Sequence, residues 1–258
     1  MYIISYDVAS KSLALSKIYF NDNWKVDLKK IENEFNTEML TCKTSETVCR
    51  CALKYIDMLE NFYDNIIQPK IFDVVDLIPG KKLKDVDVVT RSARLSAYLN
   101  MVDCNYIHSI INENQVSEKY KVLLEYQMGP NDKSRNVGSQ ILYHYSNMDT
   151  GFTCSNKLGT EYSIDKLKPV IKYDIEIIGP SLKNKISIDK DKPYSYFIQK
   201  YMKSYDANKA HSKANFLQWV KNKKCESMIV GIKKKNLDDI ADSVTMTLAW
   251  LYLKGGLI

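Results

Sequence analysis

The chain has 258 residues, 45% of them hydrophobic and 26% charged, which suits one globular protein with a full core and excludes a largely disordered chain. No apolar run is long enough to cross a bilayer, the start lacks the features of a signal peptide, and six cysteines are too few for a disulfide scaffold, so we expect a soluble intracellular protein with no membrane association. A formal net charge of +6 favours a phosphate-bearing partner only weakly, because most lysine-rich stretches are solvated surface.

The chain opens with a predicted β-hairpin. Residues 2–8 read YIISYDV, a short apolar run with Asp7 near its end, and residues 12–20 read SLALSKIYF, which is rich in strand-favouring residues. We expect two antiparallel strands joined through residues 9–11. An aspartate at the end of a strand is common as a turn-former, so Asp7 alone is a weak sign of chemistry.

A long helix and a third strand are expected next. The pattern from about residue 21 becomes helical, with a helix over 44–67. Five apolar side chains of that helix are expected to face the core: Val48, Leu53, Ile56, Leu59 and Phe62. Residues 71–78 (IFDVVDLI) end at Pro79–Gly80 and predict a strand followed by a turn.

Residues 88–102 (VVTRSARLSAYLNMV) have helical spacing, which places Arg91 and Arg94 on one face. A solvated face is the common reason for such a pair, and contact with phosphate is the alternative.

A second carboxylate ends an apolar run at 121–127 (KVLLEYQ), where Glu125 follows Val122, Leu123 and Leu124. A glutamate in such surroundings costs free energy unless it is paired, protonated or bound to a metal. Glu125 is therefore a stronger candidate than a carboxylate on a polar surface.

The next hundred residues alternate between regular and irregular segments. We expect a helix at 137–145, a loop over 146–170, a strand at 173–179 (YDIEIIG) and a lysine-rich stretch of low periodicity at 181–206. A helix at 207–222 should turn three side chains inward: Phe216, Leu217 and Val220.

The last helix is predicted within 233–253 (KKKNLDDIADSVTMTLAWLYL), after three lysines and with Asn236 or Asp238 as the cap at its start. Asp239 and Asp242 are three residues apart and therefore share a face. Acidic residues in a first turn commonly do no more than complement the helix dipole, so this pair needs distant partners.

The order of elements predicts an α/β fold with a mixed sheet, in which strands and helices alternate after an opening hairpin. In that fold Asp7, Glu125, Asp239 and Asp242 can converge. Clustered carboxylates repel unless a cation lies among them, and two divalent ions about 4 Å apart are a known arrangement for phosphodiester cleavage.

Four blocks of the sequence resemble the RuvC-like Holliday junction resolvases of poxviruses and other large DNA viruses, within the ribonuclease H superfamily. They are SYDVASKSLA at 5–14, VLLEYQ at 122–127, ANKAHSKANFLQW at 207–219 and KKNLDDIADS at 234–243. The resemblance implies a ribonuclease H-like mixed five-stranded sheet flanked by helices. It also implies one nuclease domain over 1–258 with insertions near 21–70 and 146–170, and a third strand either at 71–78, which we prefer, or at 24–30.

The resemblance further implies a Mg²⁺-dependent endonuclease that cleaves four-way DNA junctions as a homodimer, at the site of viral DNA replication. It implies that four acids bind two Mg²⁺ ions, for which Mn²⁺ can substitute: Asp7, Glu125, Asp239 and Asp242. It places Lys209 near the scissile phosphate, with Lys203 and Lys213 as competitors for that role.

Two other functions remain open at this point. The same fold serves nucleases of RNA–DNA hybrids or of other branched DNA, since fold does not fix substrate. A non-catalytic protein that binds nucleic acid or acts in transcription is the third possibility. Retention of all four acids argues against it, because clustered carboxylates with no metal to hold would destabilise the protein.

Overall fold

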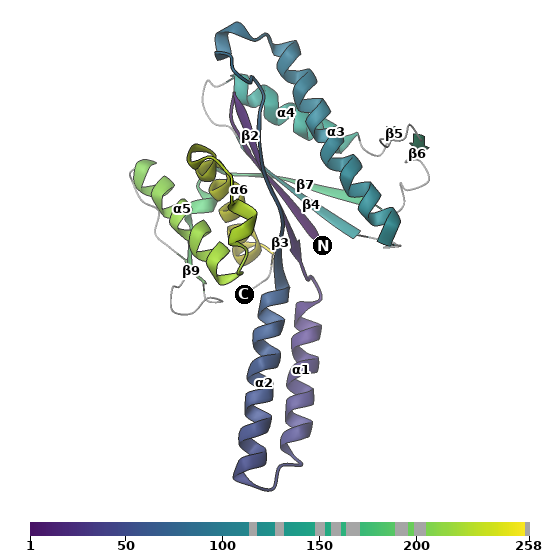
Figure 1. Cartoon of the computed structure of the whole chain (residues 1–258), viewed down its shortest axis with the longest axis vertical. Helices are drawn as coiled ribbons and strands as arrows, with labels where there is room; N and C mark the ends of the chain where they lie inside the picture. Colours follow the sequence, from purple (N-terminus) through teal and green to yellow (C-terminus); the bar gives the residue numbers. More distant parts are fainter. Residues whose placement is uncertain are drawn as a thin grey trace.

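A mixed five-stranded sheet runs through the middle of the computed structural model (Figure 1). The structure describes residues 1–113, 118–126, 132–147, 153–155, 161–163, 171–188, 196–198 and 205–255. The strands of the sheet, in their spatial order, are β3 (Ile67–Asp76), β2 (Ser12–Phe20), β1 (Tyr2–Val8), β4 (Glu118–Glu125) and β7 (Ile171–Ile178). The predicted α/β fold with a mixed five-stranded sheet is confirmed.

The pairing of the strands brings two predicted acids to one edge. β2 is antiparallel to β1 and to β3, whereas β4 is parallel to both β1 and β7. Tyr6 lies opposite Leu124, so Asp7 and Glu125, the next residue on each strand, come at the same end of neighbouring strands. Both central strands are nearly continuous apolar runs because both faces of the sheet are covered.

Helices cover the sheet on its two faces (Figure 1). Side chains alternate along β1, so Ile3 joins a core with α5 (Tyr205–Asn222) and α6 (Lys234–Leu253), whereas Ile4 joins a core with α3 (Val88–Glu113) and α4 (Asp132–Ser146). α6 packs across β1 and β2. This helix therefore carries its polar first turns to the edge where Asp7 and Glu125 lie.

A helical hairpin extends away from the sheet (Figure 1) and corrects one prediction. It consists of α1 (Trp24–Met39) and α2 (Ser45–Ile66), so the helix predicted at 44–67 is confirmed and the alternative third strand at 24–30 is wrong. Of the five side chains expected in the core, only Phe62 is buried and Leu59 is partly buried. Three are exposed: Val48 at 38%, Leu53 at 58% and Ile56 at 49%.

The reason is that most of α2 packs against α1, and only its last turns reach the core on the sheet. The rings of Phe35 and Tyr55 stack with centroids 4.2 Å apart, and Lys54 Nζ lies 2.7 Å from Glu38 Oε2. Three of the five side chains expected to face the core are left exposed in this arrangement. An amphipathic pattern shows that a face is apolar but not which element covers it.

The two arginines of α3 bind backbone carbonyl groups of neighbouring segments. Arg91 is 4% exposed, and its Nη1 donates a hydrogen bond to the Ser10 carbonyl oxygen, 3.3 Å away. Arg94 Nη1 donates to the Leu77 carbonyl oxygen at 3.1 Å. The expected solvated face is therefore wrong, because the two side chains hold the turn between β1 and β2 and the segment after β3 against the helix.

Some of the other local predictions are confirmed and some are wrong. The preferred third strand, the strand at 173–179 and the helices at 88–102, 137–145 and 207–222 are confirmed, with ends that differ by several residues. On α5 Phe216 and Val220 are buried as predicted, whereas Leu217 is 40% exposed and Trp219 is buried instead. α6 begins earlier than expected, after Lys233, and no side chain caps it, so the capping roles of Asn236 and Asp238 were wrong.

Two short strand pairs lie in the segments expected to be irregular. β5 (Thr153–Ser155) pairs antiparallel with β6 (Glu161–Ser163), and β8 (Ile186–Ile188) pairs antiparallel with β9 (Tyr196–Ile198). The rest of the predicted loop at 146–170 falls almost wholly outside the described residues. Within the described part of the chain, every helix is too short or too polar to cross a membrane.

Candidate active site

A cavity of about 770 Å³ opens where β1 and β4 end and α6 begins. Its lining includes all five side chains that the sequence singled out: Asp7, Glu125, Lys209, Asp239 and Asp242. The structure therefore brings together residues that are up to 235 positions apart, because Asp7 and Asp242 come from opposite ends of the chain.

Each acid is held by regular structure. Asp7 lies at the second-last residue of β1, and Glu125 is the last residue of β4. Asp239 and Asp242 are separated by one turn of α6 and project from the same side of it. Side chains on strands and helices keep a fixed relation to one another, as a catalytic cluster requires.

A lysine that the sequence did not single out lies among the acids. Lys183 belongs to a 3₁₀ helix, η4 (Leu182–Asn184), which packs against α6. Its Nζ lies 2.7 Å from Asp242 Oδ2, 3.1 Å from Glu125 Oε1 and 3.5 Å from Asp7 Oδ1, and its side chain is only 14% exposed. One buried ammonium group thus contacts three of the four predicted metal ligands.

Burial and mutual repulsion shift the acidity of this cluster. Burial raises the pKa of Asp7 to about 7; Glu125 acts in the same direction, and Lys183 opposes it. Burial also raises the pKa of Asp242 and of Asp239. Burial alone would lower the pKa of Lys183, but Asp7, Asp242 and Glu125 together raise it, so the ammonium form is favoured. A cation beside these acids therefore favours their charged form, as Lys183 does for Asp7 and Asp242.

The three lysines proposed near the scissile phosphate have different surroundings. Lys209 lines the cavity, is 34% exposed and lies 4.0 Å from Asp238 Oδ2. Lys213 Nζ lies 2.7 Å from Asp238 Oδ1 and does not line the cavity. Lys203 lies outside the described residues. Asp238 therefore has an ion-pairing role, which replaces the helix cap predicted for it.

The chemistry of the cavity suits a divalent cation. Carboxylate oxygens are the ligands that Mg²⁺ prefers. Among the described residues, no three potential ligand side chains already stand in metal-coordinating positions. Three carboxylates instead contact the Lys183 ammonium group, so this set of side chains can surround a cation. The residues fit a metal that takes the place of this ammonium group.

A family model described as "Poxvirus A22 protein" matches residues 165–254. The matched part contains η4, α5 and α6, and with them Lys183, Lys209, Asp239 and Asp242, whereas Asp7 and Glu125 lie outside it. The poxvirus resemblance drawn from the sequence is confirmed for this part of the chain. No curated protein sequence matches the chain.

Similar solved structures include the Holliday junction resolvase of fowlpox virus, at 13% identity and a TM-score of 0.42, with 98% of each chain covered. RuvC of Thermus thermophilus matches at 9% identity and a TM-score of 0.41, covering 98% of this chain and 96% of that one. The same RuvC in complex with a Holliday junction substrate gives 10% identity and a TM-score of 0.39, with the same coverage. The fold assignment rests on the sheet topology.

Proposed function

We propose, with the match to the poxvirus A22 family model as the premise, that this chain is a Mg²⁺-dependent endonuclease that resolves four-way DNA junctions. The observation that carries the proposal is the convergence of four carboxylates from β1, β4 and α6 on one cavity that already holds a cationic group. Such an arrangement is costly without a cation, and phosphodiester hydrolysis is the chemistry that uses it.

The proposed metal ligands are Asp7, Glu125, Asp239 and Asp242, which would hold two Mg²⁺ ions or, in their place, Mn²⁺. Metal ions bound there would supply a water of lowered pKa as nucleophile and stabilise the leaving 3′-oxygen. Lys183 must leave the cluster when the carboxylates coordinate a divalent ion, because its ammonium group contacts three of them. The chain thus exchanges one cation for another.

Lys209 is proposed as the donor to the scissile phosphate. It lines the cavity with the acids and forms only a loose ion pair with Asp238, whose Oδ2 lies 4.0 Å from its Nζ. A preorganised ammonium group can stabilise the charge that develops on the phosphate in the transition state more than it stabilises the ground state. Lys213 is less suited, because its close ion pair with Asp238 holds it outside the cavity.

Junction resolution requires two cuts related by symmetry. We propose that the protein acts as a homodimer, since two strands of a four-way junction are nicked by two sites related by a two-fold axis. We further propose that residues 1–258 form one nuclease domain, and that it acts where viral DNA replicates in an infected cell. Recognition would depend on phosphate geometry and branch shape more than on base edges.

The test is cleavage of a labelled four-way junction, an RNA–DNA hybrid and a linear duplex of matched sequence, each with Mg²⁺ or with EDTA. We expect paired, Mg²⁺-dependent nicks in the junction and little cleavage of the other two. If the protein cleaves the RNA–DNA hybrid in preference to the junction, the hybrid is its substrate and the proposed junction substrate is wrong. Tight binding with no cleavage in Mg²⁺ or Mn²⁺ would favour a non-catalytic nucleic-acid-binding protein. The Asp239→Asn variant, purified by the same procedure, controls for contaminating nucleases.

A further inference from the structure

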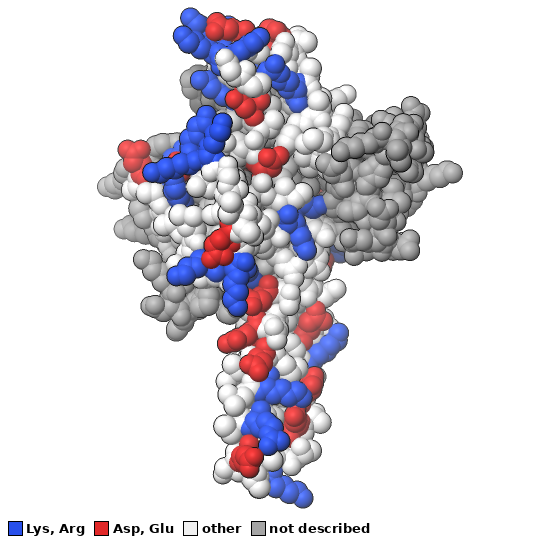
Figure 2. All heavy atoms as spheres, viewed as in Figure 1, with Lys and Arg blue, Asp and Glu red and all other residues white. Residues whose placement is uncertain are grey.

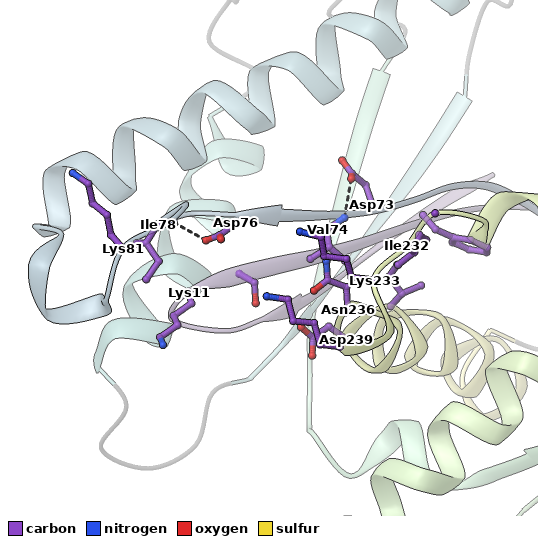
Figure 3. A pocket seen from close by; sticks show the side chains of 15 residues that line it. Lys11, Asp73, Val74, Asp76, Ile78, Lys81, Ile232, Lys233, Asn236 and Asp239 are labelled. Atoms are coloured by element: carbon purple, nitrogen blue, oxygen red, sulfur yellow. Dashed lines mark hydrogen bonds between the residues drawn. The ribbon is translucent and has the colours of Figure 1, made fainter.

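A second hollow, of about 630 Å³ and called the groove below, is lined by side chains of the β2–β3 region and of the start of α6 (Figure 3). Its walls come from the start of β2, the second half of β3 and the segment that leads into α6. Asp239 lines both this groove and the catalytic cavity. A polymeric ligand that contacts Asp239 in the catalytic cavity can therefore extend directly into the groove.

The groove is lined by four lysines from three separate segments: Lys11, Lys81, Lys233 and Lys235. All four are exposed, and none forms a salt bridge with a described residue. This distinguishes them from Lys183 and Lys213, whose ammonium groups are held by carboxylates of the protein. Their charge is available to a ligand.

Of the three acids that line the groove, Asp73 and Asp76 accept internal hydrogen bonds, and the third is Asp239, which the groove shares with the catalytic cavity. Asp73 accepts from the Tyr98 hydroxyl at 2.9 Å, and Asp76 accepts from the backbone N–H of Ile78 at 2.9 Å. Figure 3 shows the Asp73 carboxylate turned away from Lys233 and Asp239. The start of α6 adds further positive character, because no side chain caps its first backbone N–H groups. The groove is therefore suited to a chain of anionic groups.

We propose that this groove binds the sugar-phosphate backbone of a DNA strand on one side of the cleaved bond. The proposal rests on the proposed function, because the shared Asp239 makes the groove the continuation of the catalytic cavity. The lysines neutralise phosphates and hold the strand, without taking part in the chemistry. In this proposal the strand passes from Asp239 along β3 toward Lys81 (Figure 3).

The test compares two charge-matched double variants in binding to a fluorescent four-way junction in EDTA. The groove variant is Lys11→Gln with Lys233→Gln. The control is Lys29→Gln with Lys43→Gln, which removes two exposed lysines from the α1–α2 hairpin. On the face shown in Figure 2, basic and acidic side chains alternate along that hairpin, so no strong field is lost there.

We expect the groove variant to bind the junction at least several-fold more weakly and to lower the slope of log affinity against log salt by roughly 1.8, about 0.9 for each phosphate contact removed. The control should keep the affinity and slope of the unmodified protein. Equal losses in both variants, or no loss in either, would overturn the proposal.

A cross-linking experiment separates this proposal from the proposed function. A photoreactive group attached through Lys81→Cys should cross-link to one strand a fixed number of nucleotides from the junction, and an attachment through Lys43→Cys should not. Site-specific cross-linking with no cleavage of any nucleic acid would retain the groove and reject the nuclease. Cleavage of junctions with unselective cross-linking would retain the nuclease and reject the groove.

Discussion

The ammonium group of Lys183 lies 2.7 Å from the Asp242 carboxylate, inside a cavity where two more acids contact the same nitrogen. The two residues come from η4 and α6, which pack against each other, so the fold brings their side chains within reach. Buried ion pairs are strongly destabilised when one partner is removed, because an uncompensated charge is left behind.

Replacement of Lys183 by methionine should lower the stability of the metal-free protein by about 3 kcal/mol, because three carboxylates lose their shared cation. The same variant should gain more stability from added Mg²⁺ than the unmodified protein gains, since no ammonium group has to leave. Urea unfolding in EDTA and in Mg²⁺ measures both effects. Lys185→Met, at an exposed neighbouring position, is the control. An equal response of Lys183→Met and unmodified protein to Mg²⁺ would show that lysine and metal do not share a site.

Removal of a single charge from the acidic cluster should abolish cleavage while junction binding persists. Four variants test this: Asp7→Asn, Glu125→Gln, Asp239→Asn and Asp242→Asn. Each should lower the single-turnover rate by roughly 100-fold or more, since even outer-shell partners of a metal ligand can be worth that much. Asp238→Asn should be tolerated, because its carboxylate pairs with Lys213 outside the cavity. A variant of the four that keeps near-normal Mg²⁺-dependent cleavage is not a ligand.

Lys209→Ala should slow single-turnover cleavage at saturating protein by roughly 10²- to 10³-fold, with a much smaller effect on junction binding. This magnitude is that of a preorganised donor lost from a transition state. Lys213→Ala is the matched control, since it lies on the same helix and pairs with the same aspartate. Comparable small effects of the two substitutions would assign Lys209 to ordinary phosphate binding.

The acid stability of the protein should depend on Glu176, on β7. This carboxylate accepts hydrogen bonds from Trp250 Nε1 and Lys254 Nζ, each at 2.8 Å, and lies 2.9 Å from Lys121 Nζ. Partial burial alone would raise the pKa of Glu176, but these partners lower it to about 2, from a usual value of 4.5.

Since the folded-state pKa lies below the unfolded one, the stabilisation is present above about pH 4.5 and is lost as pH falls toward 2. Glu176→Gln should lower the free energy of unfolding at pH 7 on the order of 2 kcal/mol, with solvent screening allowed for. The difference from unmodified protein should shrink by pH 3. Glu32→Gln, at an exposed position on α1, should change neither value. A difference between Glu176→Gln and unmodified protein that does not vary with pH would mean that the loss arises from packing.

The sequence predicted the central sheet well and the surroundings of its acids less well. Apolar runs such as 2–8 and 121–127 identify buried strands because two covered faces leave no room for polar residues. Pairing in parallel then brings Asp7 beside Glu125. Lys183 could not be recognised in the same way, since a lysine in a lysine-rich stretch of low periodicity resembles solvated surface. Only the packing of η4 on α6 gives it a buried position.

The α1–α2 hairpin leaves the sheet and returns to it at adjoining points. Phe20, the last residue of β2, lies opposite Ile67, the first residue of β3, so the strands on either side of the hairpin are already in register. A tight turn in place of the two helices would preserve every rung of that ladder. Lengthening or loss of the hairpin during evolution would therefore leave the catalytic edge of the sheet unaltered. The length of the hairpin can change independently of the active site.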